Sequence, residues 1–175
     1  MPAAFFERVL GPHLKYSSGL WTEDVRTLAD AEAAMLALTI ERADLHDGQR
    51  ILELGCGWGS LTLYMAQRFP RARILAVSNS ASQRAFIERR AGELGVSNLS
   101  VVTADVSQLR LADLGTFDRV VSVEMFEHMR NWPEMFRRVA GWLKPGGRFF
   151  MHVFVHRLTP YLFVERDNGD WMSRY

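Results

Sequence analysis

Cysteine is almost absent from the sequence, because its 175 residues include only Cys56. A disulfide within the chain is therefore excluded, and a metal site built from cysteines is disfavoured. This scarcity favours a reducing, cytoplasmic setting. Long apolar runs are missing too, since no stretch approaches the roughly 18 residues of a transmembrane helix. The first 13 residues carry an early acid and no apolar core, so we expect no signal peptide.

An excess of either charge is also lacking. Lys and Arg number 21 and Asp and Glu number 20, which gives a net charge of +1. This balance argues against a nucleic-acid partner. The pairs Arg89-Arg90 and Arg137-Arg138 lie in helical stretches with acids nearby, so we expect them on solvated helix faces.

The N-terminal part of the chain, residues 1–46, has no strand-like pattern. Residues 1–20 mix aromatic and polar side chains around Gly11-Pro12 and Ser17-Ser18-Gly19, which break regular structure. The following residues predict an amphipathic helix over 28–45. Its expected apolar face carries Leu28, Ala31, Met35 and Leu38.

From residue 47 onward, short apolar runs alternate with segments of helical period. Continuous apolar strands separated by helices predict a parallel sheet that is covered on both faces. Right-handed crossovers make this an α/β, Rossmann-like doubly wound domain, residues 47–175. The expected strands are 51–56, 73–79, 99–105, 117–124 and 148–156, and the expected helices are 60–69, 81–94 and 133–143, the last closed by Pro145-Gly146-Gly147.

A glycine-rich turn, Gly55 to Gly59, joins the first strand to the first helix of this domain. Bare backbone lets a ligand approach closely, and the helix N-terminus offers N–H groups to an anion. A tight structural turn is the alternative interpretation. A dinucleotide site would place an acid at the end of the second strand, which instead ends Val77-Ser78-Asn79, so a nicotinamide cofactor is disfavoured.

Polar residues also end the third and fourth strands, where such sheets bind ligands. Asp105 is equally consistent with a ligand contact and with a turn former. Glu124, Glu127 and His128 form a cluster in which crowding and burial raise carboxylate pKa values, as a proton acceptor requires. A helix N-terminus decorated with acids is the alternative. No helical H-E-x-x-H is present, and the expected fifth strand carries His152 and His156 apart from this cluster, so we expect no metal.

Several segments resemble class I S-adenosylmethionine-dependent methyltransferases. Within that class they are most similar to the cyclopropane-fatty-acid synthase superfamily, on the branch with coclaurine-type N-methyltransferases. The segments are YSSG at 16–19, ELGCGWGSLTLYMA from Glu53, VSNSASQ at 77–83, VEMFEHMRNW at 123–132, LKPGG at 143–147, HVFVHRLTPY at 152–161 and DWMSRY at the end.

The resemblance implies S-adenosylmethionine as cofactor, with residues 1–46 covering it. It assigns the methionine part to Glu53 and the three glycines, Gly55, Gly57 and Gly59, and its carboxylate to Tyr16 and Ser17. It assigns Ser78, which stands where a threonine is common, and Asn79 to cofactor binding, and it places Gln83 near the ribose. It places Asp105, followed by Val106, at the adenine amine. His152 matches a position near the reaction centre, although a core histidine is the alternative. Trp58 walls the pocket or packs, and we expect Trp132 to pack.

The acceptor implied by the resemblance is a small-molecule amine. Glu127 with His128 would accept the amine proton, and Glu124 would hold the amine. Modification of unsaturated phospholipid chains is the alternative, but that pocket uses a cysteine where this chain has Ser18. A cofactor-binding fragment with little activity is the third interpretation, because relatives continue with further strands, and we expect a C-terminally truncated sheet with an exposed edge. A homodimer is left open.

Overall fold

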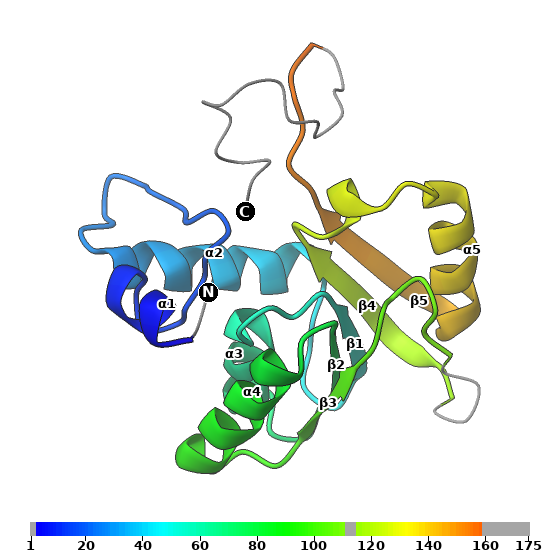
Figure 1. The fold of residues 1–175 in the computed structure, drawn as a ribbon, viewed down its shortest axis with the longest axis horizontal. Helices are drawn as coiled ribbons and strands as arrows, with labels where there is room; N and C mark the ends of the chain where they lie inside the picture. Colours follow the sequence, from blue (N-terminus) through cyan, green and yellow to red (C-terminus); the bar gives the residue numbers. More distant parts are fainter. Residues whose placement is uncertain (1–2, 111–114, 159–175) are drawn as a thin grey trace.

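A computed structural model describes residues 3–110 and 115–158 of the chain, so the closing DWMSRY segment lies outside the described residues. Its centre is one sheet of five parallel strands in the order β3-β2-β1-β4-β5 (Figure 1). This order confirms the expected Rossmann-like doubly wound arrangement. The strands are β1 (Arg50–Leu54), β2 (Arg73–Ser78), β3 (Leu99–Thr103), β4 (Phe117–Val123) and β5 (Leu143–His152).

The predicted helices after β1, β2 and β4 are present, and an additional short helix precedes α2 near the N-terminus. The sequence does not predict this N-terminal helix, α1, because its residues lack a clear period. Thr27 and Asp30 form a capping box that begins α2. The helices are α1 (Ala3–Val9), α2 (Leu28–Arg42), α3 (Ser60–Arg68), α4 (Ala81–Leu94), the 3₁₀ turn η2 (Phe126–His128) and α5 (Trp132–Trp142).

The two faces of the sheet carry alternate residues of the same strands. Ile51 of β1 packs with α2 and α3, whereas its neighbour Leu52 packs on the opposite side with Met135 and Val139 of α5. Helix α4 contributes Phe86 and Ile87 to a third cluster. Figure 1 accordingly shows α2, α3 and α4 on one side of the strands and α5 on the other. The period of two explains why unbroken apolar runs fold as strands here.

The buried face of α2 differs from the predicted one. Leu28 is exposed, and Met35 and Leu38 are only half-buried. Of the four expected residues only Ala31 is fully buried; the others on that face are Glu32, Leu36, Thr39 and Ile40. The expectation was wrong because it assumed an apolar face, whereas the buried face of this helix contains a carboxylate and a hydroxyl that have partners of their own.

The start of β5 also differs from the prediction. Strand β5 begins at Leu143 and ends at His152, rather than spanning 148–156. Leu143 pairs with Phe117 and Arg148 with Arg119, so one side of the ladder has three more residues than the other. The Pro145-Gly146-Gly147 segment therefore lies in a bulge within the strand, which an irregular pairing accommodates.

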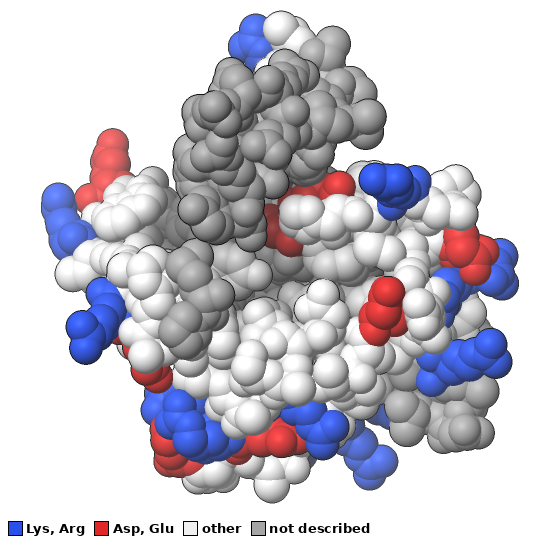
Figure 2. All heavy atoms as spheres, in the orientation of Figure 1, with Lys and Arg blue, Asp and Glu red and all other residues white. Residues whose placement is uncertain are grey.

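Charged side chains are dispersed over the surface, and Figure 2 shows Lys and Arg with Asp and Glu between them. Arg89 and Arg90 both pair with Glu93, and Arg137 pairs with Glu134, as expected for solvated helix faces. Arg138 instead donates to the backbone carbonyls of Ser107 and Leu109. None of the helices in the described part of the chain has the length and apolar character that crossing a bilayer demands.

Candidate functional site

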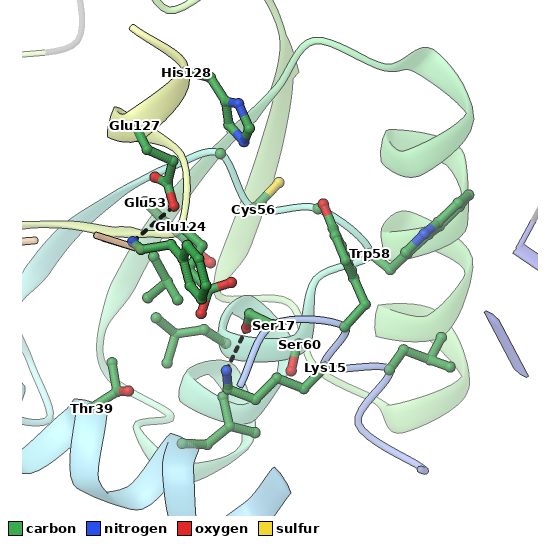
Figure 3. Close-up of a pocket in the computed structure, with 18 residues that line it drawn as sticks. Lys15, Ser17, Thr39, Glu53, Cys56, Trp58, Ser60, Glu124, Glu127 and His128 are labelled. Carbon is green, nitrogen blue, oxygen red and sulfur yellow. Dashed lines mark hydrogen bonds between the residues drawn. The ribbon is translucent and has the colours of Figure 1, made fainter. Parts of the chain in front are cut away.

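A cavity of about 360 Å³ opens at the carboxyl ends of β1 and β4, where the strand order reverses. Five segments line it: the N-terminal segment before α2, α2 itself, the end of β1 with the glycine turn and the start of α3, the end of β4 with the residues after it, and Phe154 after β5 (Figure 3). This is the position at which doubly wound sheets bind ligands. Of the predicted site residues, it brings together Tyr16, Ser17, Glu53, Gly55, Gly57, Glu124, Glu127 and His128.

The remaining predicted residues lie outside the cavity wall. Ser78 donates a 2.5 Å hydrogen bond to Gln83, which ties the end of β2 to the start of α4. Asp105 accepts hydrogen bonds from the backbone N–H and the hydroxyl of Ser107 at 2.8 and 2.7 Å. Its carboxylate therefore closes a turn in this structure, which is the alternative that the sequence leaves open. Gly59, Asn79 and Val106 also do not line the cavity, so the ligand roles of these six residues stay predictions.

The glycine turn is closely packed at the two positions that line the cavity, Gly55 and Gly57. The N–H of Gly55 donates to the carbonyl of Val77 at 2.9 Å, and a Cβ atom at Gly55 would lie 2.7 Å from Met125. A Cβ at Gly57 would instead meet the ring of Tyr16 at 3.1 Å, at the cavity wall. A left-handed backbone and close packing, against Met125 for Gly55 and against Tyr16 for Gly57, thus account for both glycines.

Glu53 is a fully buried carboxylate at the end of β1 whose side chain reaches the cavity. It accepts a 2.6 Å hydrogen bond from the hydroxyl of Thr62 on α3. Burial raises the pKa of Glu53 to about 7, and the bond from Thr62 opposes that rise. The group is therefore poised between its neutral and charged forms near neutral pH, and a cation in the cavity would favour the charged form.

The raised pKa of Glu53 makes a prediction about stability. The unfolded chain has the ordinary value of 4.5, so Glu53 stabilises the fold fully below about pH 4.5, and that contribution is lost as pH rises through about 7. Over this window we expect a loss of about 3 kcal/mol in the free energy of unfolding. Urea unfolding of wild type and Glu53→Gln from pH 4.5 to 8 tests it. The difference in the free energy of unfolding between the two proteins should change by that amount. Parallel pH profiles of this free energy would contradict the raised pKa of Glu53.

Glu124 directly follows β4 in a left-handed backbone conformation, with φ of +50°. Residues other than glycine adopt this conformation at a cost, and such strain is concentrated at functional sites. Its carboxylate accepts hydrogen bonds of 3.2 Å from both the backbone N–H and the hydroxyl of Ser18. The backbone N–H of Glu124 donates to the carbonyl of His152 at 2.7 Å. Glu124 thereby joins the N-terminal segment to the end of the sheet.

Glu127 lines the cavity, and only one of its two carboxylate oxygens has a partner in the described structure. Its Oε1 accepts a hydrogen bond from the N–H of Phe154 at 3.0 Å, drawn as a dashed line in Figure 3. Its Oε2 is buried and has no hydrogen-bond partner among the described residues. Such an atom is costly unless something binds it, so Oε2 marks a place for a donor. His128 follows in η2 and also lines the cavity.

Sequence reasoning misses several cavity residues. Lys15 precedes the matched YSSG segment, and Thr39 belongs to the face of α2 that the apolar pattern misplaces. The hydroxyl of Ser60, at the start of α3, is buried without a partner in the part of the chain that is described. The spacing of Leu36 and Thr39 is an available signal, since both lie on one helix face. The others are Leu14, Cys56, Trp58, Leu61, Val123 and Phe154, of which the sequence suggests only Trp58 for the wall.

The expectations for the two tryptophans and the two histidines have different outcomes. Trp132 donates to the backbone carbonyls of Phe126 and Met129, so it packs as expected. Trp58 both packs, between Phe6 and Phe86, and lines the cavity. Since β5 ends at His152, His156 lies beyond the strand, contrary to the expectation that the fifth strand carries both residues. Within the described residues, no group of three His, Cys, Asp or Glu could hold a metal ion.

Comparison with known proteins connects this geometry to a family. The sequence profile described as mycolic acid cyclopropane synthetase matches residues 1–175, the whole chain. The chain belongs to that family. The relatives of this chain are named for different reactions, as the following two show.

Two curated relatives illustrate the range. The (S)-coclaurine N-methyltransferase of Thalictrum flavum subsp. glaucum is 39% identical over 175 residues, covering 100% of this chain and 48% of the relative. The cyclopropane-fatty-acyl-phospholipid synthase of Escherichia coli strain K12 is 33% identical over 172 residues, covering 97% of this chain and 41% of the relative. The chain therefore spans about half the length of the curated relatives that it matches.

Solved structures of both kinds of protein are similar to this chain. A coclaurine N-methyltransferase bound to N-methylheliamine and SAH superimposes with a TM-score of 0.91 at 38% identity, covering 99% of this chain and 50% of the other. The cyclopropane synthase MmaA2 from Mycobacterium tuberculosis gives a TM-score of 0.76 at 26% identity, with coverage of 85% and 52%. The described sheet is thus the fold of class I methyltransferases.

Proposed function

We propose that this chain binds S-adenosylmethionine in the cavity and transfers its methyl group to the nitrogen of a small-molecule amine. The observation that carries the proposal is that Glu124 and Glu127 line the same cavity as the glycine turn. With Glu53, the wall holds three carboxylates against one lysine, and Figure 2 shows acidic side chains at the bottom of the central hollow. This balance favours a cationic ligand. The relatives named for coclaurine support an amine over a lipid.

The residues present fit this cofactor. Gly57 leaves the backbone bare at the wall, Glu53 can take an ammonium group, and Ser60 offers a hydroxyl without a partner in the described structure. When bound, the sulfonium supplies an already activated methyl group. Tyr16 and Ser17 would bind the cofactor from the N-terminal side, so we propose that residues 1–46 cover it, above a core formed by residues 47–175. The roles predicted for Ser78, Asn79, Gln83, Asp105 and Val106 stay proposals.

The residues after β4 would supply positioning and proton transfer. Glu124 is fixed by two bonds from Ser18 and can hold the amine against the cavity wall. Glu127 is fixed at Oε1 by Phe154, so Oε2 is oriented to accept the amine proton, with His128 beside it. A protonated amine exposes its lone pair only after losing that proton, which is why an acceptor here accelerates transfer. The cytoplasmic setting suggested by the single cysteine remains a prediction.

Binding and product analysis test the proposal in sequence. Calorimetry should detect S-adenosylmethionine and no nicotinamide nucleotide. With the longest natural form of this chain, mass spectrometry should then find methylated product from a panel of cyclic secondary and tertiary amines. Vesicles of unsaturated phospholipid should give no cyclopropane product. Absence of cofactor binding would refute the whole proposal, and modification of lipid alone would refute the amine as acceptor.

A further inference from the structure

The loop of residues 11–20 lies between α1 and α2 and forms part of the cavity wall (Figure 1). It contains neither helix nor strand, and only two of its residues, Leu14 and Lys15, are buried. A segment with so little buried apolar surface opens easily unless polar contacts hold it in place. The hydrogen bonds of this loop therefore decide how often it leaves the cavity.

Both ends of the loop are attached to adjacent residues of α2. At its start, the N–H groups of Gly11 and His13 donate to the two carboxylate oxygens of Glu32, each at 3.0 Å. At its end, the N–H of Leu20 donates to the carbonyl of Ala31 at 3.0 Å. A loop whose two ends lie close together is typical of Ω-loops, which frequently carry functional residues. The part of this loop that lines the cavity lies between the two attachments.

Glu32 forms the attachment with the clearer adaptation. Its side chain is 0% exposed, and it does not line the cavity. Burying a carboxylate is costly, and the two N–H groups offset that cost because hydrogen bonds to a charged acceptor are strong. A Cβ atom at Gly11 would lie 2.5 Å from Oε2 of Glu32. Since the φ of Gly11 is not positive, this close approach is what requires glycine there.

We propose that Glu32 is a positioning residue that holds the loop of residues 11–20 closed against the cavity. In the closed loop Tyr16 lies at the cavity wall, and Ser18 donates to Glu124. The inference rests on the proposed function, because the ligands of the cavity are what the closed loop would contact. A ligand that contacts the loop binds its closed form, so ligand binding and loop closure favour each other.

Cleavage by lysyl endopeptidase reports opening of the loop, because the chain has only two lysines, Lys15 and Lys144. Lys15 lies in the loop and is 5% exposed, so the protease reaches it only when the loop opens or the whole chain unfolds. Lys144 lies in β5, so the protease cuts there only when the sheet unfolds. Mass spectrometry distinguishes the fragments from the two cuts, so both rates come from one digest.

Glu32→Gln tests the attachment directly. Glutamine keeps the size of the side chain but offers only one acceptor oxygen, so one of the two N–H groups loses its partner. A hydrogen bond to a charged group corresponds to about tenfold to a hundredfold in an equilibrium constant. Cleavage after Lys15 should therefore accelerate by about that factor. Saturating S-adenosylmethionine should slow this cleavage in wild type and in the variant, because it stabilises the closed loop.

The matched control is Ile40→Ala, on the same helix. Ile40 is buried in a cluster to which no residue of the 11–20 loop belongs, and it does not line the cavity. The cluster stays intact when the loop alone opens. Ile40→Ala should therefore accelerate cleavage after Lys144 through global unfolding and leave cleavage after Lys15 nearly unchanged.

The outcomes separate this inference from the proposed function. An unchanged rate after Lys15 in Glu32→Gln, or equal acceleration of that rate by Ile40→Ala, would overturn the inference and leave the proposed function standing. The same holds if S-adenosylmethionine binds in calorimetry without slowing the cut after Lys15. Failure of wild type to bind S-adenosylmethionine would overturn both. Gly11→Ala, whose Cβ would displace the Glu32 carboxylate, should also accelerate this cut and serves if Glu32→Gln does not unfold cooperatively.

Discussion

Glutamine in place of Glu127 should lower the turnover of amine methylation by about a hundredfold or more, with little change in affinity for S-adenosylmethionine. Glutamine has nearly the same shape, and its oxygen can still accept from the N–H of Phe154. The amide cannot take up a proton at the position of Oε2, where the cavity needs an acceptor. Single-turnover kinetics measure the rate, and calorimetry measures the affinity.

The control for Glu127→Gln is the same substitution at Glu134, a half-buried residue of α5 that pairs with Arg137 and does not line the cavity. That variant should keep full activity. Glu124→Gln should mainly raise the KM for the amine, since this residue is proposed to hold the acceptor. Full turnover in Glu127→Gln would remove Glu127 from the chemistry, whatever the other two variants show.

Alanine at Gly59 should destabilise the fold by about 2 to 4 kcal/mol. Gly59 has φ of +83°, a conformation that residues with a side chain adopt at a cost. A Cβ there would lie 2.6 Å from Ile87, which is a fully buried residue of α4 and cannot move aside freely. Urea unfolding at one fixed pH measures the loss.

Gly48 separates the two causes of that loss. It has the same φ of +83°, but a Cβ built there meets no atom within 4 Å. Gly48→Ala should therefore cost only the backbone strain, about 1 to 2 kcal/mol. The excess in Gly59→Ala measures the contact with Ile87. Equal losses in the two variants would show that this contact relaxes without cost.

The core of the fold is predictable because its signals are local. Each strand of the sheet is a short apolar run, and a glycine or proline marks most of the boundaries. Strand ends converge at one edge of a parallel sheet, so the sequence alone is enough to place Glu53, Gly57 and Glu127 near one another. Their shared cavity follows from topology and not from their spacing along the chain.

The N-terminal half of the site cannot be predicted in the same way. Ser18 meets Glu124 across 106 residues, and nothing near either residue indicates that contact. The burial of Lys15 depends on the anchor at Glu32, a charged residue that an apolar pattern places on the wrong face of α2. Such contacts pair polar groups whose partners come from elsewhere in the fold, and periodicity carries no information about partners.

Cys56, the chain's single thiol, lies in the cavity wall and is 5% exposed. Burial raises the pKa of this thiol, so the reactive thiolate is scarce. A maleimide or a disulfide reagent would therefore label one site only, and a ligand in the cavity would cover that site. The unmodified protein thus carries its own reporter, with which occupancy can be followed without knowing the acceptor.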